Sequence, residues 1–218
     1  IDPRLFSIKK NEVAQILAIG IPASITNFMQ SFGMAMTNRY LLVYGNDKVA
    51  AMGIMMKVNM IASLVLVGFA FGGQPLIGYN YGAGNKKRLK EILGFSYKFE
   101  CSTALVFAII LSVVARPLIL VFIKTPEIVD AAVLMLRMQQ IGMVFMAIVL
   151  VTTCVFQSMG YAVGAFTLSI SRQGVLYVVV LMIASQIFGY YGVIISQAIS
   201  DFLTAMMALV LLKRSLAK

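Results

Sequence analysis

The chain is dominated by six long apolar runs, and short segments rich in glycine, proline or charged residues separate them. An α-helix needs about 20 consecutive apolar residues to cross the roughly 30 Å hydrocarbon core of a bilayer. Each run reaches that length. The runs cover residues 13–44, 49–79, 92–115, 128–156, 165–188 and 193–212. We therefore predict an all-α, polytopic membrane protein whose fold is a bundle of six transmembrane helices.

Composition excludes most other classes of protein. Hydrophobic residues make up 61% of the 218 residues and charged residues only 12%, which is outside the range of soluble globular domains. The chain has no histidine, and its two cysteines, Cys101 and Cys154, stand apart in apolar runs without neighbouring ligand residues. An intramembrane enzyme would need paired carboxylates, a serine with a base, or an HExxH motif. We therefore expect no catalytic residue, no metal site and no cofactor.

The basic residues predict the orientation, because cytoplasmic loops of membrane proteins retain lysine and arginine. If the N-terminus is cytoplasmic, twelve of the 18 basic residues fall on the inner side. They are Arg4, Lys9, Lys10, Lys86, Lys87, Arg88, Lys90, Lys98, Arg172, Lys213, Arg214 and Lys218. This placement explains the net charge of +10 without nucleic acid as a partner. We expect a cytoplasmic linker or interfacial segment at 1–12, the bundle at 13–212 and a cytoplasmic tail at 213–218.

Polar residues inside a membrane span normally face other helices or a water-filled cavity. Three of the predicted helices carry faces of polar residues and methionine, at spacings that place them on one side of each helix. The candidate substrate-binding residues are Asn27, Gln30, Met34, Met56, Asn59, Gln139, Met143 and Met146. Methionine is flexible and polarisable, which suits a cavity that accepts ligands of several shapes. The alternative is that methionine only fills the helix interfaces.

Several charged residues lie deep enough in the spans to need partners. Arg172 and Asp201 lie on the last two helices at depths that differ by about 5 Å. We predict that they form a buried pair, with either a structural or a coupling role. Glu100 is expected to extend toward the basic inner loop, and Lys57 and Arg137 toward the outer face.

Three sequence segments carry a family resemblance. Residues 73–85 read Gly-Gln-Pro-Leu-Ile-Gly-Tyr-Asn-Tyr-Gly-Ala-Gly-Asn and are followed by Lys-Lys-Arg. This segment resembles the end of the eighth helix of MATE multidrug exporters. Gly20-Ile21-Pro22 is similar to the opening of that family's seventh helix. Phe156-Gln157-Ser158-Met159-Gly160 and Ser171-Arg172-Gln173 resemble its tenth and eleventh helices.

The resemblance implies a transporter of twelve helices in two lobes, of which this chain matches the C-terminal one. It implies a multi-pass protein of the bacterial cell membrane, with the N-terminal lobe and membrane lipids as partners. It also implies export of cationic, amphipathic, drug-like compounds in exchange for H⁺ or Na⁺, by alternating access. Because the chain starts at Ile1, we expect a piece of a longer protein. The alternatives are a flippase for lipid-linked saccharides, from the same superfamily, and a complete six-helix protein that dimerises.

Two positions depart from part of the family. Some members carry a carboxylate ten residues after the glycine of the Gly-Ile-Pro motif, where this chain has Gln30. They carry another on the tenth helix, where this chain has Ile148. We therefore expect this lobe to lack a cation site of its own at these positions, with the coupling carboxylate in the N-terminal lobe. Gln30 would then line the cavity as a neutral hydrogen-bonding group.

Overall fold

The computed structural model describes the backbone of residues 10–216 and the side chains of residue 21 and residues 24–215. This part of the chain is helical and contains no β-strand. The helices are α1 (Lys10–Leu42), α2 (Asn46–Gly82), α3 (Lys86–Val113), α4 (Ala115–Leu120), α5 (Pro126–Gln140), α6 (Met143–Ser158), α7 (Ala162–Gln173) and α8 (Val175–Leu216). Residues 1–9 of the expected linker and residues 217–218 of the expected tail lie outside the described residues, and α8 continues through Leu216.

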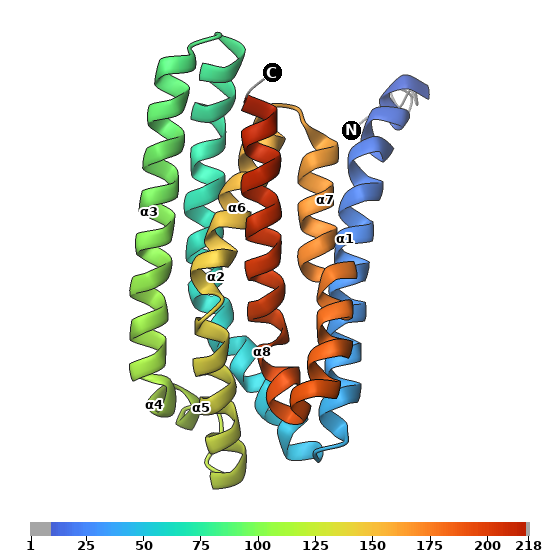
Figure 1. The fold of residues 1–218 in the computed structure, drawn as a ribbon, viewed down its shortest axis with the longest axis vertical. Helices are drawn as coiled ribbons and strands as arrows, with labels where there is room; N and C mark the ends of the chain where they lie inside the picture. The colour runs from blue at the N-terminus through green and yellow to red at the C-terminus, as the bar shows by residue number, and fades with distance from the viewer. Residues whose placement is uncertain (1–9, 217–218) are drawn as a thin grey trace, which may run out of the picture.

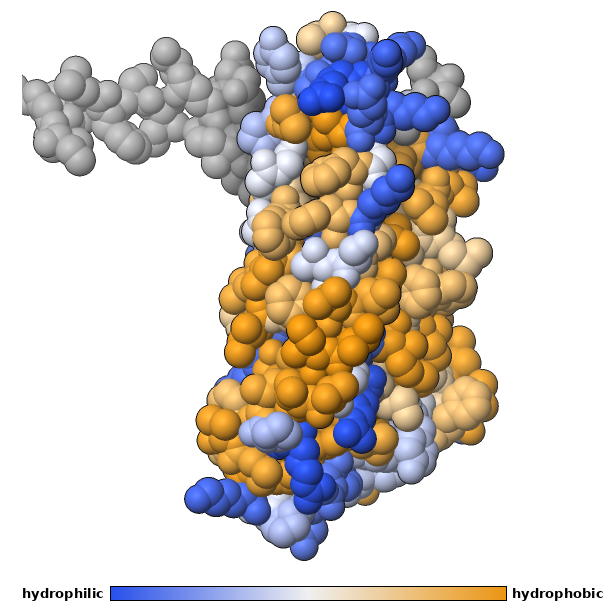
Figure 2. All heavy atoms as spheres, turned by 90° about the vertical axis from the view of Figure 1, so that its left-hand side faces the viewer, coloured by the Kyte–Doolittle hydropathy of each residue, from blue (hydrophilic) through white to orange (hydrophobic). Residues whose placement is uncertain are grey.

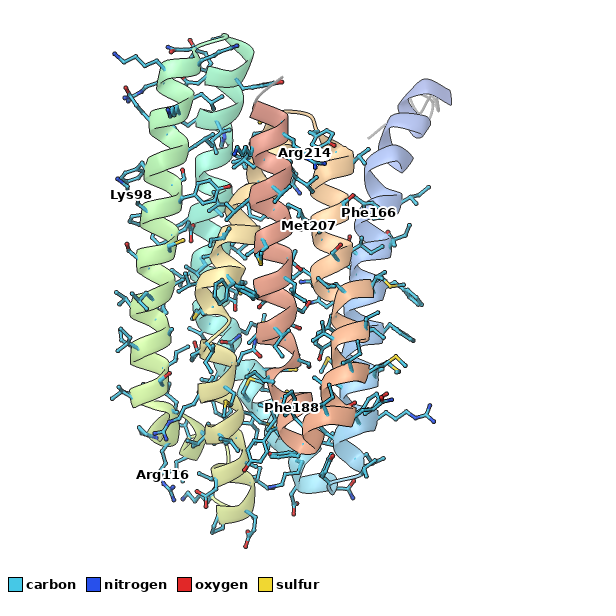
Figure 3. The ribbon with its side chains drawn as sticks, viewed as in Figure 1. Lys98, Arg116, Phe166, Phe188, Met207 and Arg214 are labelled. Atoms are coloured by element: carbon cyan, nitrogen blue, oxygen red, sulfur yellow. The ribbon has the colours of Figure 1, made fainter. Side chains whose placement is uncertain are left out.

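The helices run up and down in one elongated bundle (Figure 1). The start of α1, the α2–α3 turn and the end of α8 lie at one end of the bundle. The α1–α2 turn and the α4–α5 connection lie at the other. Basic residues concentrate at the first end, at the start of α3 and in the last turn of α8. Arg214 and Arg116 mark the two opposite ends in Figure 3. The two described ends of the chain therefore lie on the same side of the bundle.

Two breaks divide the longest helical stretches. α5 and α6 are bent by 51° relative to each other, at the junction formed by Ile141 and Gly142. Gly189 has φ 56 and ψ −129, and Figure 1 shows α8 reversing its direction there. A positive φ is cheap only for glycine, which explains why the chain turns at this residue. With these breaks, α5–α6 forms one bent segment, and α7–α8 forms two antiparallel ones.

Length and composition agree with a membrane protein. Three stretches among the described residues are long and apolar enough to cross a membrane, or up to four if the bent α5–α6 pair counts as one span. One of the three is the 54-residue stretch from Ala162 to Ser215, which Gly189 divides. Figure 2 shows a broad apolar band on one face of the molecule, with hydrophilic residues gathered at both ends. The chain is a polytopic helical membrane protein, as its apolar runs predict.

Pro75 lies inside α2 and does not end it. The helix continues through this proline to Gly82. A proline removes one backbone hydrogen bond, and the packing of a 37-residue helix offsets that loss. The end of α2 is instead followed by a turn in which Gly84 has a φ of 67. Asn85 then caps α3, since its side chain accepts a hydrogen bond from the backbone N–H of Arg88.

The bundle has two clusters of buried apolar residues. The larger one joins α2 to α3, α4, α5, the start of α6 and the first part of α8, and it includes Leu66, Leu136 and Leu181. The smaller one joins α3, α6, α7 and the end of α8 around Phe156 and Leu168. The bend between α5 and α6 lies within the larger cluster, because Leu136 before it and Met143 after it both belong to that cluster.

Gly142 allows the α5–α6 bend to lie directly against α8. A Cβ atom on Gly142 would lie 2.8 Å from the Cα of Ala198. We predict that Gly142→Ala destabilises the fold by about 1–3 kcal/mol, because helix backbone cannot move aside as a flexible side chain can. Thermal unfolding in detergent measures this effect. Gly94→Ala is the matched control, because a Cβ there meets nothing within 4 Å. An equal loss in both variants would contradict the prediction.

Candidate substrate cavity

A cavity of about 650 Å³ lies among α1, α2, the bent α5–α6 segment, α7 and α8. This volume is in the range of sites that bind drug-sized molecules. Neutral polar side chains and methionine make up much of its lining. Six methionines contribute, namely Met34, Met52, Met55, Met56, Met60 and Met146.

The structure brings six of the eight predicted substrate-binding residues to this cavity. They are Gln30 and Met34 on α1, Met56 and Asn59 on α2, Gln139 on α5 and Met146 on α6. The three predicted helices, the last of which is divided into α5 and α6, therefore present polar and methionine side chains to one space. Their binding role stays a prediction.

Asn27 and Met143 do not line the cavity, contrary to expectation. Met143 is only 3% exposed and belongs to the larger apolar cluster. Its predicted position assumed one straight helix from Gln139 to Met146, but the bend at Ile141 and Gly142 turns Met143 into the core. Asn27 lies almost one turn before Gln30 on α1 and is exposed outside the cavity.

Other lining residues were not predicted as substrate-binding residues. They include Thr37, Asn38, Thr153, Gln157, Gln173, Tyr177 and Gln197. Thr37 and Tyr177 share a hydrogen bond between their hydroxyl groups, which joins α1 to α8. The available signal was the same as for the predicted residues, namely polar side chains within apolar runs. It was missed on the first and fourth runs for Thr37, Asn38 and Thr153, and on the last two runs for Gln173, Tyr177 and Gln197.

Hydrogen bonds between helices hold several of the polar groups. The Nε2 of Gln140 donates to the Oδ1 of Asn59 at 3.1 Å, which links α5 to α2. The Nε2 of Gln74 donates to the Oε1 of Gln157 at 2.7 Å, which links α2 to α6. Bonds of this kind fix the orientation of cavity side chains before a ligand arrives, so less entropy is lost on binding.

Arg172 and Asp201 form an ion pair beside the cavity. The Nε of Arg172 donates to the Oδ1 of Asp201 at 2.8 Å, and Gln197 donates to the same oxygen at 3.0 Å. Asp201 is 1% exposed, whereas the Arg172 side chain is 16% exposed and reaches the cavity wall. The expected contact is therefore present, and its structural or coupling role stays a prediction.

The cavity wall is nearly neutral. Among the described residues that line it, Arg172 is the one charged side chain, and its charge is balanced by Asp201. Gln30 takes part as a neutral amide. Ile148 is half-buried and packs against the smaller apolar cluster. No group of three or more potential metal-binding side chains occurs in the described part of the chain.

The other charged residues in the spans behave differently from one another. Lys57 is exposed, and the Nε of exposed Arg137 donates to the carbonyl oxygen of Ser112 at 3.1 Å. Glu100 contradicts the expectation that it extends toward the basic inner loop, because it is only 2% exposed. The residue faces inward on α3, and a glutamate side chain is too short to reach the helix end from there.

Comparison with known proteins decides the family. The profile of the MatE family matches residues 22–183. The chain belongs to the MatE family. It is 29% identical over 211 residues to the "Multidrug export protein MepA" of Staphylococcus aureus strain NCTC 8325, covering 95% of this chain and 46% of that protein. The protein of the same name from Staphylococcus haemolyticus is 29% identical over 203 residues, covering 92% and 44%.

Solved structures of MatE-family transporters share the fold. An outward-facing multidrug resistance MATE transporter superposes with a TM-score of 0.86 at 21% identity, covering all of this chain and 49% of that one. The Vibrio cholerae MATE transporter VcmN in its bent form gives a TM-score of 0.86 at 18% identity, covering 96% and 48%. The chain spans about half the length of the relatives it matches, and it has the fold of one lobe of such a transporter.

The buried ion pair yields a stability prediction. Arg172→Gln leaves the buried carboxylate of Asp201 without its cation, so we expect a loss of about 3–5 kcal/mol. Arg116→Gln is the matched control, because the Arg116–Asp130 pair is 60% and 64% exposed and should contribute at most about 1 kcal/mol. Thermal unfolding of purified protein in detergent measures both. Equal effects would show that the buried pair does not stabilise the α7–α8 contact.

Proposed function

We propose that this chain is the C-terminal lobe of a multidrug transporter, which exports amphipathic, cationic, drug-like compounds in exchange for H⁺ or Na⁺. The cavity lined by methionine and neutral amides carries this proposal. A wall that combines flexible apolar groups with a few hydrogen-bonding groups can accept molecules of different shapes. The names of the relatives, which are multidrug export proteins, support the same substrate class.

The mechanism we propose is alternating access, with the cavity as one wall of the transport path. The proposed partner is an N-terminal lobe, since the relatives are about twice as long as this chain. The part of the cavity wall described here offers no carboxylate of its own. A coupling carboxylate would therefore belong to that other lobe, and Gln30 would contact the substrate without binding the coupling ion.

We also propose a location in the bacterial cell membrane with both termini of this segment cytoplasmic. The basic start of α3 and the basic end of α8 lie at the same end of the bundle (Figure 1), which supports this orientation. Membrane lipids would surround the exposed apolar band.

A flippase for lipid-linked saccharides is the second candidate, and the cavity charge argues against it. Such a substrate carries a pyrophosphate, which would need several uncompensated cationic groups. Arg172 is the one cation among the described lining residues, and it is already paired with Asp201. Lys57 and Arg137, which could have supplied further charge, do not line the cavity.

Drug efflux from membrane vesicles tests the proposal. The protein is reconstituted with any adjoining sequence retained, and ethidium efflux is followed under an imposed pH gradient or sodium gradient. We expect efflux under one gradient, and we expect Gln30→Ala to change the relative rates for different cationic drugs by about two- to tenfold, since a single hydrogen bond is lost. Gln186→Ala is the control, because Gln186 is exposed and does not line the cavity.

The possible results separate the candidates. Absence of drug movement under either gradient would refute the multidrug proposal and favour lipid-linked substrates. Efflux with an unchanged drug profile in Gln30→Ala would refute the position of Gln30 in the substrate path. An altered profile in Gln186→Ala as well would show that the change does not report on the cavity.

A further inference from the structure

A second cavity, of about 580 Å³, lies among α2, α3 and α6. Phe69, Gly73 and Leu76 of α2 line it. Asn59, Ser63 and Val67 of the same helix line the substrate cavity. At 100° per residue, the mean directions of these two sets differ by about 110° around α2. The second cavity also lies beside a later part of α2, so it is a separate space from the substrate cavity.

Glu100 lies in the wall of this second cavity and has no partner. Its side chain is 2% exposed, and neither carboxyl oxygen makes a hydrogen bond. It lies 14 residues into α3, about 21 Å along the helix from Lys86 and near its middle. A buried carboxyl without a hydrogen bond is costly, and ionisable groups inside membrane spans are usually functional.

Among the described residues, no cation forms an ion pair with Glu100. Lys98 is on the same helix but points away from the bundle in Figure 3. Arg88, which lines the far end of the cavity, is already paired with Glu91 at 3.0 Å. The other titratable side chains in this region are the thiols of Cys101 and Cys154 and the hydroxyl of Tyr97, which carry no positive charge.

Aromatic rings line the same cavity. Phe95 and Phe99 stack with their centroids 5.7 Å apart, and Phe69 meets Phe99 edge to face at 5.0 Å. Faces of aromatic rings attract cations, and more strongly where water is excluded. The cavity thus combines one unpaired carboxyl, three phenylalanine rings and enough volume for a drug-sized molecule.

We propose that this cavity is a second ligand site, which binds a lipophilic organic cation with Glu100 as its counter-charge. The cation would pair with the carboxyl of Glu100, which the protein leaves without a partner. The phenylalanine rings would contact the apolar groups of the cation. Phosphate, nucleotide and other anionic ligands do not fit a site with this charge. The inference does not require the substrate cavity to be a transport path.

Binding of tetraphenylphosphonium to the purified, intact protein in nanodiscs tests the inference. We expect Glu100→Gln to remove one equivalent of bound cation per chain, or to weaken that binding at least tenfold. Glu91→Gln is the matched control on the same helix and the same cavity, because Glu91 is exposed and paired with Arg88. Tetraphenylborate, of the same shape and opposite charge, should not bind at this site.

A second variant keeps the test decisive if Glu100→Gln fails to fold. Phe99→Leu removes one ring and should weaken the same equivalent about three- to fivefold. If Glu100→Gln folds and binds tetraphenylphosphonium with unchanged stoichiometry and affinity, the inference is overturned. If Glu100→Gln does not fold, the same unchanged binding in Phe99→Leu overturns it. Equally strong binding of tetraphenylborate would show that the cavity does not select for positive charge, which would also overturn the inference. Gln30→Ala acts on the other cavity, so failure here leaves the proposed transport function standing.

Discussion

The structure depends on one constraint, which is that backbone and polar groups inside a bilayer have no water to bind. Long helices satisfy most of their backbone groups internally. The chain departs from this pattern mainly at glycines, such as Gly142 at the α5–α6 bend and Gly189 at the reversal in α8. The substrate cavity is a consequence of the first break, because a straight α5–α6 helix would not place Gln139 and Met146 on one side and Met143 in the core.

The Arg172–Asp201 pair places charged groups in the buried interior, where no water is present to bind them. Asp201 receives hydrogen bonds from Arg172 and Gln197 on the same oxygen, while its other oxygen has no partner. A Cβ on Gly142 would lie 3.4 Å from that second oxygen. Gly142 therefore allows the α5–α6 bend to approach α8 next to the Arg172–Asp201 pair. The ion pair offsets the cost of burying the two charges between α7 and α8.

The sequence predicted the helices well because long apolar runs have few alternative structures in a membrane. It predicted the Arg172–Asp201 contact because similar depth on consecutive segments brings two side chains close. It failed for Met143 and Glu100 for a common reason. Sequence position gives the depth of a residue, but its direction depends on local bends and on which neighbour covers it. Tyr177 was missed because its hydroxyl partner, Thr37, lies 140 residues away.

Two carboxyl groups are almost equally buried in this lobe, and their surroundings distinguish them. Asp201 has an arginine and a glutamine amide as donors, so its burial is explained by the structure itself. Glu100 has neither, and the cavity beside it contains aromatic rings and no free cation among the described residues. The two cavities beside α2 therefore differ in electrostatic character. One is nearly neutral and suited to varied ligands, whereas the other contains a buried carboxyl for which the proposed organic cation would supply the counter-charge.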